Sequence, residues 1–298
     1  MPPRPRLAVT LGDPRGIGPE VVARALAEGL DAEVTLIGAD DQIAGISAAR
    51  RVGVGPWGAE TEERQAGRLA ALAVEQAVAL ARAGEVEAIV TGPVHKHALH
   101  VAGFRYPGLT EFLAHLAGDV EVAMMLAAGA LRVALVTTHI ALKDVPAQVT
   151  AERVVRCGRL TERALTTWWG IARPRLAVCA LNPHAGESGL FGDEDERVLR
   201  PAAEALGARG PLPADTVFVR ALRGEFDAVL APYHDVGMTA VKVAGFGTGV
   251  NVTLGLPFPR VAPDHGTAFD IAGRGIADPR SMRAALELGV ALAARHPR

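Results

Sequence analysis

Residues 7–30, LAVTLGDPRGIGPEVVARALAEGL, combine a short apolar run, a glycine-rich turn and a helix-forming stretch. The run LAVTL is apolar and partly β-branched, which is typical of a buried strand. The helical stretch opens with Pro19, and proline favours the first turn of a helix. We therefore predict a strand over 7–11 and a helix over 19–30. The turn between them would present backbone N–H groups to an anion, although a plain tight turn fits this segment equally well.

The same alternation of short apolar runs and longer helical patterns continues along the chain. The apolar residues between 69 and 81 repeat at roughly helical spacing. Several predicted strands are apolar almost throughout, as in parallel strands covered by helices on both faces, so the sequence predicts an α/β fold. Residues 40–68 combine Gly, Pro and charge with weak periodicity, and we expect a surface excursion there. The predicted strands are 7–11, 34–38, 88–91, 120–126, 132–136, 175–181, 228–230 and 249–253, and further helices are predicted over 151–169, 194–206 and 281–294.

Two stretches divide this pattern into two α/β subdomains, which we expect to flank a central cleft. Residues 103–108 are rich in Gly and Pro, and residues 223–227 carry a run of charge. Such stretches are typical of crossings between domains. We therefore expect one subdomain from residues 1–104 together with 229–298, and the other from residues 105–228.

The composition argues against several classes of protein. The chain has 298 residues, with 31 Lys and Arg against 33 Asp and Glu, so its formal net charge is -2. It has no dense basic run, which argues against nucleic acid and anionic membranes as partners. No apolar run approaches the roughly 18 residues of a membrane helix, and we expect a cytoplasmic protein. The two cysteines, Cys157 and Cys179, lie in apolar or helical stretches, which fits packing roles in a reducing compartment.

Three histidines, His139, His184 and His234, each follow a predicted strand by a few residues. In open α/β sheets, ligands bind outside the carboxyl ends of the strands, which meet at one edge. Any one of these histidines alone is more often a hydrogen-bonded loop residue. Three converging imidazoles, however, suit a divalent metal with open positions for substrate, and we predict such a site.

A second group of polar residues lies nearer the C-terminus. Lys242, Asn251 and Arg260 occur in the glycine-rich stretch VKVAGFGTGVNVTLGLPFPR. Two cations and an amide suit a substrate that bears carboxylate or phosphate, because Arg forks onto such anions and Lys acts as a point charge. Scattered surface cations are the competing interpretation. Residues 264–279, DHGTAFDIAGRGIADP, add His265 and a flexible loop.

Across these motifs the sequence resembles the 4-hydroxythreonine-4-phosphate dehydrogenases of pyridoxal phosphate biosynthesis. The agreement spans nearly the whole chain, and several independent motifs in the family's order are far more specific than a lone glycine-rich loop. The family shares the fold of isocitrate and isopropylmalate dehydrogenases, which explains the lack of a Rossmann fingerprint. The matching motifs are LGDPRGIGPE, TGPVHK, VTTHIALKDVP, LNPHAGE, GPLPADTVF, YHD, GFGTGVNVTLGLPF and DHGTA.

The resemblance implies roles for particular residues. It implies a divalent metal (zinc, magnesium or cobalt) bound by His139, His184 and His234. It also implies a homodimer with its active site at the subunit interface. Residues 264–279 look like the loop that embraces the adenosine half of NAD. The implied substrate contacts are Thr110, Lys242, Asn251 and Arg260, and the implied cofactor contacts are His265, Gly266, Thr267, Ala268 and Asp270.

The reaction implied by the resemblance is an NAD-dependent, metal-assisted oxidation of 4-hydroxythreonine 4-phosphate, with decarboxylation to 3-amino-2-oxopropyl phosphate. The metal would polarise the substrate hydroxyl and then hold the ketone. Lys242 and Asp215 are candidates for the group that takes the hydroxyl proton, and Lys143 with Asp144 is another pair. Asp270, and the lack of a clustered Arg patch beside it, favour NAD over NADP.

Two positions depart from the family's pattern. Where the family has Gly-His-Thr-Glu-Phe, this chain has Leu109 in place of a histidine that contacts substrate. In the family's YHDQG motif, Val236 replaces the glutamine. The change at Leu109 leaves open a paralogue that acts on another four-carbon hydroxy-acid phosphate. A metallohydrolase and a phosphate acyltransferase are alternatives from other classes, but the first has no use for a nicotinamide loop and the second has no use for three metal-bound imidazoles.

Overall fold

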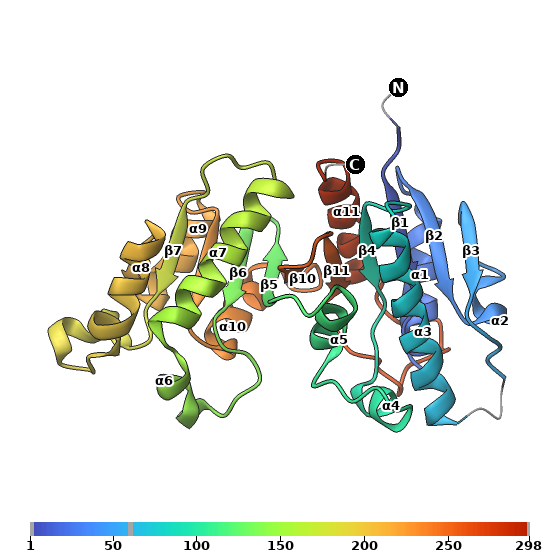
Figure 1. The fold of residues 1–298 in the computed structure, drawn as a ribbon, viewed down its shortest axis with the longest axis horizontal. Coiled ribbons are helices and arrows are strands. Elements are labelled where there is room, and N and C mark those ends of the chain that lie inside the picture. Colours follow the sequence, from blue (N-terminus) through green and yellow to red (C-terminus); the bar gives the residue numbers. More distant parts are fainter. Residues whose placement is uncertain (1–2, 59–61, 297–298) are drawn as a thin grey trace. The chain divides into compact units, whose positions relative to one another are not determined.

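The computed structural model describes residues 3–58 and 62–296, and the chain divides into two compact units. Unit 1 comprises Met1–Val122 with Val250–Arg298, and unit 2 comprises Ala123–Gly249. In each unit, helices pack against β-strands that are mostly parallel (Figure 1). The predicted α/β class is therefore confirmed. None of the helices among the described residues is long and apolar enough to cross a membrane.

The strands of unit 1 are parallel to their neighbours, with one exception. Strand β10 runs antiparallel to β11, whereas β11, β4, β1, β2 and β3 are parallel in succession. Parallel neighbours need a crossover segment between them. Helices of this unit supply it among β1, β2 and β3, whereas the chain between β4 and β11 passes through unit 2. The strand order is β3 (Arg50–Gly53), β2 (Glu33–Gly38), β1 (Arg6–Thr10), β4 (Ala88–Thr91), β11 (Arg260–Pro263) and β10 (Val250–Leu254).

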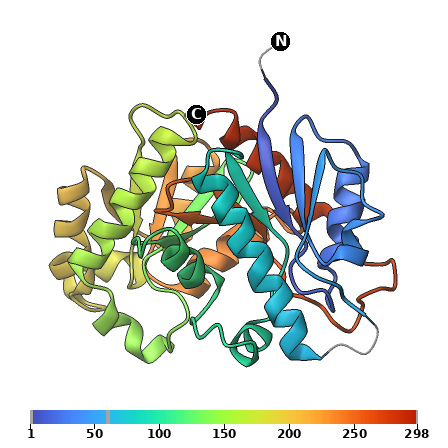
Figure 2. The ribbon, with the colours of Figure 1, turned by 45° about the vertical axis from the view of Figure 1, so that its right-hand side comes forward.

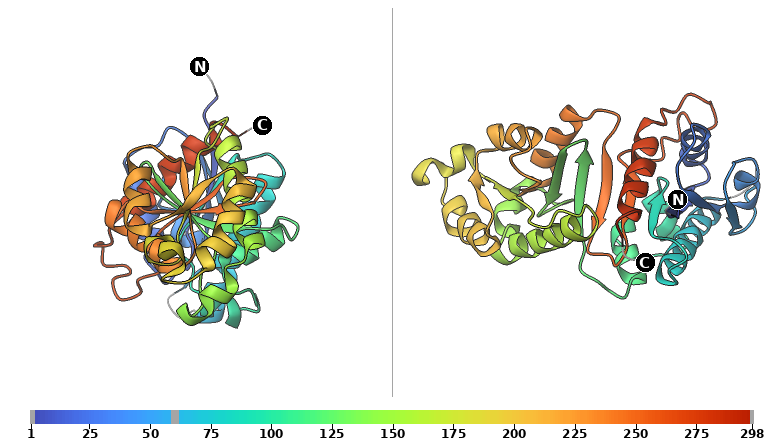
Figure 3. Two further views of the ribbon diagram at one scale, coloured as in Figure 1. Left: turned by 90° about the vertical axis from the view of Figure 1, so that its left-hand side faces the viewer. Right: turned by 90° about the horizontal axis from the view of Figure 1, so that it is seen from above.

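Helices cover both faces of these strands. Successive side chains of a strand point to opposite faces. On β1, Ala8 belongs to the cluster formed with α3 (Glu63–Arg82), whereas a Cβ added to Gly289 of α11 (Arg280–Ala293) would lie 3.8 Å from Leu7. Helices α3 and α11 therefore lie on opposite faces (Figure 3), and α1 packs against α11. The other helices are α1 (Gly18–Ala27), α2 (Asp40–Ile43), α4 (Lys96–Val101) and α5 (Leu109–Leu116).

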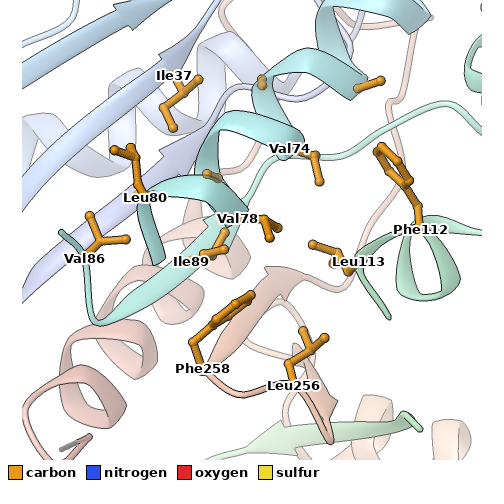
Figure 4. Close-up of a cluster of buried hydrophobic side chains, with 14 of the residues drawn as sticks. Ile37, Val74, Val78, Leu80, Val86, Ile89, Phe112, Leu113, Leu256 and Phe258 are labelled. Atoms are coloured by element: carbon orange, nitrogen blue, oxygen red, sulfur yellow. The ribbon is translucent and has the colours of Figure 1, made fainter. Parts of the chain in front are cut away.

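The main core of unit 1 lies between α3 and the strands, and Figure 4 shows it in close-up. Val74 and Val78 of α3 belong to the same cluster as Ile89 of β4. Phe112 of α5 and Phe258, just before β11, complete the cluster from more distant parts of the sequence. Burial of each of these side chains contributes about 1.5–3 kcal/mol of transfer free energy. The core thus ties α5 and the C-terminal strands to α3.

Unit 2 has a second set of strands. Strand β6 pairs in parallel with β9, β9 with β7 and β7 with β8, whereas β5 and β6 form an antiparallel pair. Because β6, β9 and β7 are parallel, their C-terminal ends lie at one edge. The strand order is β5 (Ala123–Ala128), β6 (Leu131–Leu135), β9 (Ala228–Ala231), β7 (Leu176–Cys179) and β8 (Arg209–Leu212).

The helices of unit 2 also lie on both faces of its strands. Leu176 and Ala228 pack with Leu165 of α7, whereas their neighbours Ala177 and Val229 pack with residues of α9 and α10. Cys157 and Cys179 are free and buried, and burial raises the pKa of each thiol to about 12, so the predicted packing role is confirmed. The elements between the strands are η1 (Leu142–Asp144), α6 (Val145–Gln148), α7 (Ala151–Thr167), η2 (Pro183–Gly189), η3 (Asp195–Leu199), α8 (Arg200–Leu206), α9 (Ala214–Leu222) and α10 (His234–Ala244).

The boundaries of the two units lie later in the chain than the predicted positions after residues 104 and 228. Helix α5 joins unit 1 because Phe112 and Leu113 pack in the α3 core. Strand β9 joins unit 2 because it pairs with β6 and β7, and α10 packs on the same strands. The Gly and Pro stretch at 103–108 is therefore a turn within unit 1 and not a crossing between units.

Candidate active site

The three predicted metal ligands follow parallel strands of unit 2. His139 lies in the loop after β6, His184 lies in η2 after β7, and His234 begins α10 after β9. Their strands end at one edge of the unit, as the sequence predicts. The side chains of His139 and His184 are exposed, and that of His234 is half-buried.

His139 and His234 are brought together. Their ring centroids lie 5.5 Å apart, with the rings tilted by 47°. Two imidazoles bound to one ion at about 2 Å per bond, in tetrahedral geometry, would place their centroids roughly 5 Å apart, so the pair fits two ligands of one metal. The Nδ1 atom of His234 lies 2.7 Å from a carboxylate oxygen of Asp235, a contact that orients the ring.

His184 lies in a left-handed turn. The residues from His184 to Ser188 all have positive φ, between 44° and 83°. The buried carboxylate of Asp195 holds the start of this turn by accepting hydrogen bonds from the backbone N–H groups of Leu181 (2.8 Å) and Asn182 (2.9 Å). The ring of His184 lies 6.4 Å from that of Phe191.

Within the part of the chain that the structure describes, no three side chains of metal-ligating type form a group. The structure thus brings together two of the three predicted ligands. Asp195 is not evident as a site residue from the sequence, because only the folded loop brings its carboxylate back to the turn that carries His184. Its signal in the sequence was an acidic residue that closes the loop GDED after the LNPHAGE motif.

Arg260, a predicted substrate contact in unit 1, is a buried cation with two side-chain hydrogen bonds. It lies on β11 with 4% of its surface exposed, and its guanidinium donates to the hydroxyls of Thr253 (3.0 Å) and Thr91 (2.5 Å). Burial lowers the pKa of Arg260 to about 10, so the side chain still carries its charge at neutral pH. Among the described residues its side-chain partners are these two hydroxyls and no carboxylate, and its Nε has no hydrogen-bond partner. A buried charge normally has a partner of opposite sign, so this cation is suited to an anion from outside the chain.

Asn251 lies on the neighbouring strand. On β10 it is two residues from Thr253, so the two side chains point to the same face, and Thr253 contacts Arg260. The Oδ1 atom of Asn251 is buried without a hydrogen-bond partner in the described structure. The two strands therefore offer a cation and an amide whose hydrogen-bonding capacity is incompletely used.

The remaining predicted substrate and catalytic residues are on helices. Thr110 is the second residue of α5 in unit 1 and is half-buried. Lys242 lies in the last turn of α10, and Asp215 lies in the first turn of α9, both in unit 2 and both exposed. Each unit thus carries a part of the predicted set.

The predicted cofactor residues lie on the loop that joins β11 to α11. The Nε2 atom of His265 is buried without a hydrogen-bond partner among the described residues, and Thr267 is buried. Ala268 has a positive φ of 41°, whereas Gly266 and Asp270 are exposed. An unused imidazole nitrogen beside exposed backbone is suited to the polar groups of a nucleotide.

Leu109 is the first residue of α5, directly after Gly108. It is half-buried and packs against the hydrophobic cluster of unit 1. Leu109, one of the two positions at which the chain departs from the family's pattern, therefore contributes to packing beside Thr110.

Comparisons with known proteins cover nearly the whole chain. The sequence profile of the family described as pyridoxal phosphate biosynthetic protein PdxA matches residues 17–289. A D-threonate 4-phosphate dehydrogenase of Cupriavidus necator is 44% identical, with 98% of each chain covered. A 4-hydroxythreonine-4-phosphate dehydrogenase of Beijerinckia indica is also 44% identical, with 96% of this chain and 94% of the relative covered.

A comparison with solved structures also finds 4-hydroxythreonine-4-phosphate dehydrogenases. The 4-hydroxythreonine-4-phosphate dehydrogenase of Klebsiella pneumoniae matches with a TM-score of 0.87 at 39% identity, over 97% of this chain and 99% of that one. A phosphotransacylase of Enterococcus faecalis matches with a TM-score of 0.61 at 14% identity, which shows a shared fold alone. The resemblance and the dehydrogenase class expected from the sequence are confirmed. The chain belongs to the PdxA family of pyridoxal phosphate biosynthetic proteins.

Proposed function

We propose that this protein oxidises a four-carbon hydroxy-acid phosphate, 4-hydroxythreonine 4-phosphate, with NAD and a divalent metal, and that decarboxylation then gives 3-amino-2-oxopropyl phosphate. The observation that carries the proposal is the buried Arg260, whose charge has only neutral hydroxyl partners among the described residues. A phosphorylated carboxylic acid supplies the anion that this residue lacks. Relatives at 44% identity are named as dehydrogenases of such compounds.

The substrate would be held mainly through its charges. Arg260 would fork onto an anionic group, and the unpaired amide of Asn251 would add a hydrogen bond. Thr110 would offer a hydroxyl and Lys242 a point charge. Thr91 and Thr253 orient the guanidinium without neutralising it, because hydroxyls accept hydrogen bonds but carry no charge.

The chain's own residues also fit the groups that supply the redox chemistry. His139 and His234, with His184 as third ligand, would hold the metal, and the loop residues His265, Gly266, Thr267, Ala268 and Asp270 would hold the nucleotide. When bound, the nicotinamide accepts a hydride and the metal polarises the reacting oxygen. Asp215, or Lys242 in its uncharged form, would take the proton of the substrate hydroxyl. Asp215 lies in the first turn of α9, and Lys242 lies in the last turn of α10. We infer a cytoplasmic homodimer.

A second substrate is favoured by a specific observation. The relative of Cupriavidus necator is named for D-threonate 4-phosphate, which carries a hydroxyl at C2 where 4-hydroxythreonine 4-phosphate carries an ammonium. Leu109 cannot form a hydrogen bond, so the group that contacts position 109 in the family would lose a partner here. Both compounds carry a carboxylate and a phosphate, and either group can supply the anion for Arg260.

The experiment is an assay of NADH formation by the purified protein. It would use both substrates, both nicotinamide cofactors and zinc, magnesium or cobalt in turn. We expect turnover with NAD in preference to NADP, loss of turnover with a chelator and recovery on readdition of metal. Arg260→Lys should lower kcat/KM about ten- to a hundredfold for either substrate, because an ammonium cannot make the bidentate contact. Absence of NADH formation under all these conditions would contradict the proposal.

A further inference from the structure

We propose that Glu20 and Arg24 are positioning residues for the cofactor: they clamp the loop between β11 and α11 in the shape that receives the nucleotide. The inference rests on the proposed function, because it takes this loop as the cofactor loop. It also gives the LGDPRGIGPE motif a role that neither an anion site nor a plain turn describes. Figure 2 shows the loop, in orange-red, beside the blue segment that leads into α1.

The first attachment is a backbone contact at the start of the loop. The N–H of Ile17 donates to the carbonyl oxygen of Thr267 over 2.9 Å. This N–H belongs to the residue that precedes α1, so it is one of the groups that an anion would otherwise contact. A Cβ added to Gly16 would lie 2.8 Å from the same carbonyl oxygen, so glycine is needed for this approach.

The second attachment is made by side chains at the far end of the loop. The carboxylate of Glu20 accepts hydrogen bonds from the N–H groups of Ala277 (2.9 Å) and Gly275 (3.3 Å). Arg24, one turn later on α1, donates to the carbonyl oxygen of Ala277 over 2.6 Å. Together the two side chains satisfy both backbone groups of Ala277, as a neighbouring strand would. Glu20 is well placed for this role because the first turn of a helix stabilises a negative charge.

A third contact lies between these two. The guanidinium of Arg15 stacks on the ring of Phe269 at 4.9 Å from its centroid. Arg15 is itself fixed by the fully buried Asp13, which accepts from its Nε (3.0 Å) and one Nη (2.8 Å). The rings of His95 and Phe269 form a T-shaped pair with their centroids 5.1 Å apart.

The attachments leave the middle of the loop accessible. Asp270, Gly273 and Arg274 are exposed. Backbone hydrogen bonds within this stretch form local turns, such as the one from the N–H of Arg274 to the carbonyl oxygen of Ile271 (3.2 Å). A loop fixed at both ends loses less conformational freedom when it binds a ligand, and this preorganisation increases affinity. The clamp should therefore act on cofactor affinity and not on the chemical step.

The test compares Glu20→Ala and Glu20→Gln with the wild type by amide hydrogen exchange and by NADH binding, followed through nucleotide fluorescence. In Glu20→Ala we expect exchange protection at Gly275 and Ala277 to fall about tenfold or more, because the loop end opens locally. The Kd for NADH and the KM for NAD should rise about three- to tenfold with kcat within about twofold of wild type. Glu20→Gln keeps one acceptor oxygen and should lie between the two.

Glu28→Ala is the matched control, because Glu28 caps the same helix at its other end and its carboxylate lies 3.8 Å from Arg283. It should leave both measurements at wild-type values. Wild-type protection in Glu20→Ala, or lost protection with an unchanged Kd, would overturn the clamp. If the wild-type protein fails to bind NADH, the proposed function is wrong, whereas the exchange measurement still decides whether Glu20 holds the loop.

Discussion

At the scale of single residues, the environment of a side chain decides its role more than its identity does. Arg175 and Arg260 are the same amino acid in two different environments. Arg175 is exposed, and its guanidinium donates two hydrogen bonds to the carboxylate of Asp227. Arg260 is buried, and its guanidinium contacts only hydroxyl groups among the described residues. An exposed ion pair contributes about 0–1 kcal/mol to stability. A buried cation without a counter-charge costs free energy instead, which a bound anion would offset.

Leu109→His tests whether the side chain at position 109 affects substrate specificity. We expect this change to raise kcat/KM for 4-hydroxythreonine 4-phosphate relative to D-threonate 4-phosphate, because an imidazole can pair with a polar substrate group and leucine cannot. The measurement is the ratio of the two kcat/KM values at equal metal occupancy, since an added histidine could also recruit the ion. An unchanged ratio would show that the side chain at 109 serves packing alone.

Leu109→Met is the control for this prediction. It keeps the contact with the hydrophobic cluster and, as a volume-conserving change, should cost under about 1.5 kcal/mol of stability. The substrate ratio of Leu109→Met should equal that of the wild type. A shift of similar size in both variants would indicate a general disturbance of α5.

At the scale of elements, close approach of backbones fixes where the helices lie. Gly67 faces α4 from α3, and a Cβ added there would lie 2.0 Å from the carbonyl oxygen of Ala98. In an isolated helix, alanine in place of glycine is stabilising by about 1 kcal/mol. In this protein we expect Gly67→Ala to destabilise by about 1–3 kcal/mol, because α4 must move. Urea unfolding would measure it.

Gly45→Ala is the matched control, because a Cβ added at Gly45 meets no atom within 4 Å. Its free energy of unfolding should stay within about 0.5 kcal/mol of the wild type. If Gly67→Ala were as stable as this control, α3 and α4 would not be held at the distance seen.

The elements that the sequence predicts are those whose own residues carry the signal. Strands β1 and β4 are runs of buried apolar residues, and α7 has a helical pattern with a Thr150 cap, so each is evident from a short window. Strand β3 (RRVG) is half-exposed and polar and falls in the stretch predicted as a surface excursion. Strands β8 (RGPL) and β11 (RVAP) contain proline, and β11 buries an arginine, so neither has a strand pattern.

In the candidate site, too, some contacts are predictable from the sequence and others are not. The rule that ligands gather at the carboxyl ends of parallel strands places His139 and His234 together from the sequence. The contacts of Glu20 with Gly275 and Ala277 join residues 255 and 257 positions apart. Such a partner depends on the complete fold, so no local pattern predicts it.

At the scale of the whole molecule, unit 2 exposes large apolar side chains. Val243 and Phe246 are 80% and 82% exposed, and Leu142 is 68% exposed. Val243 follows Lys242 in the last turn of α10, and Phe246 lies two residues after the helix ends. Large exposed apolar side chains are candidates for a protein interface, so Val243 and Phe246 are suitable positions at which to test the proposed homodimer.

We therefore expect a solution mass of twice 31.1 kDa by light scattering at micromolar concentration. The double change Val243→Ser and Phe246→Ser should shift the solution mass toward that of a single chain, because it replaces two large exposed apolar side chains with polar ones. Val219→Ser, at a site 45% exposed on α9, is the control and should leave the mass unchanged. A wild-type mass of a single chain would contradict the homodimer.

Unit 1 is formed by two separate segments of the chain, so during synthesis it is completed after unit 2. Unit 2 is complete in sequence at Gly249, but unit 1 still lacks β10, β11 and α11, which arrive after that point. Until they emerge from the ribosome, the edge of β4 that pairs with β11 has no partner strand, and Leu7 and Val90 lack the helix that covers them. Unpaired strand edges and uncovered apolar faces are sites of aggregation in nascent chains. During synthesis, unit 1 therefore keeps an unpaired strand edge and an uncovered apolar face after the whole of unit 2 has been made, although the first strand of unit 1 is made first.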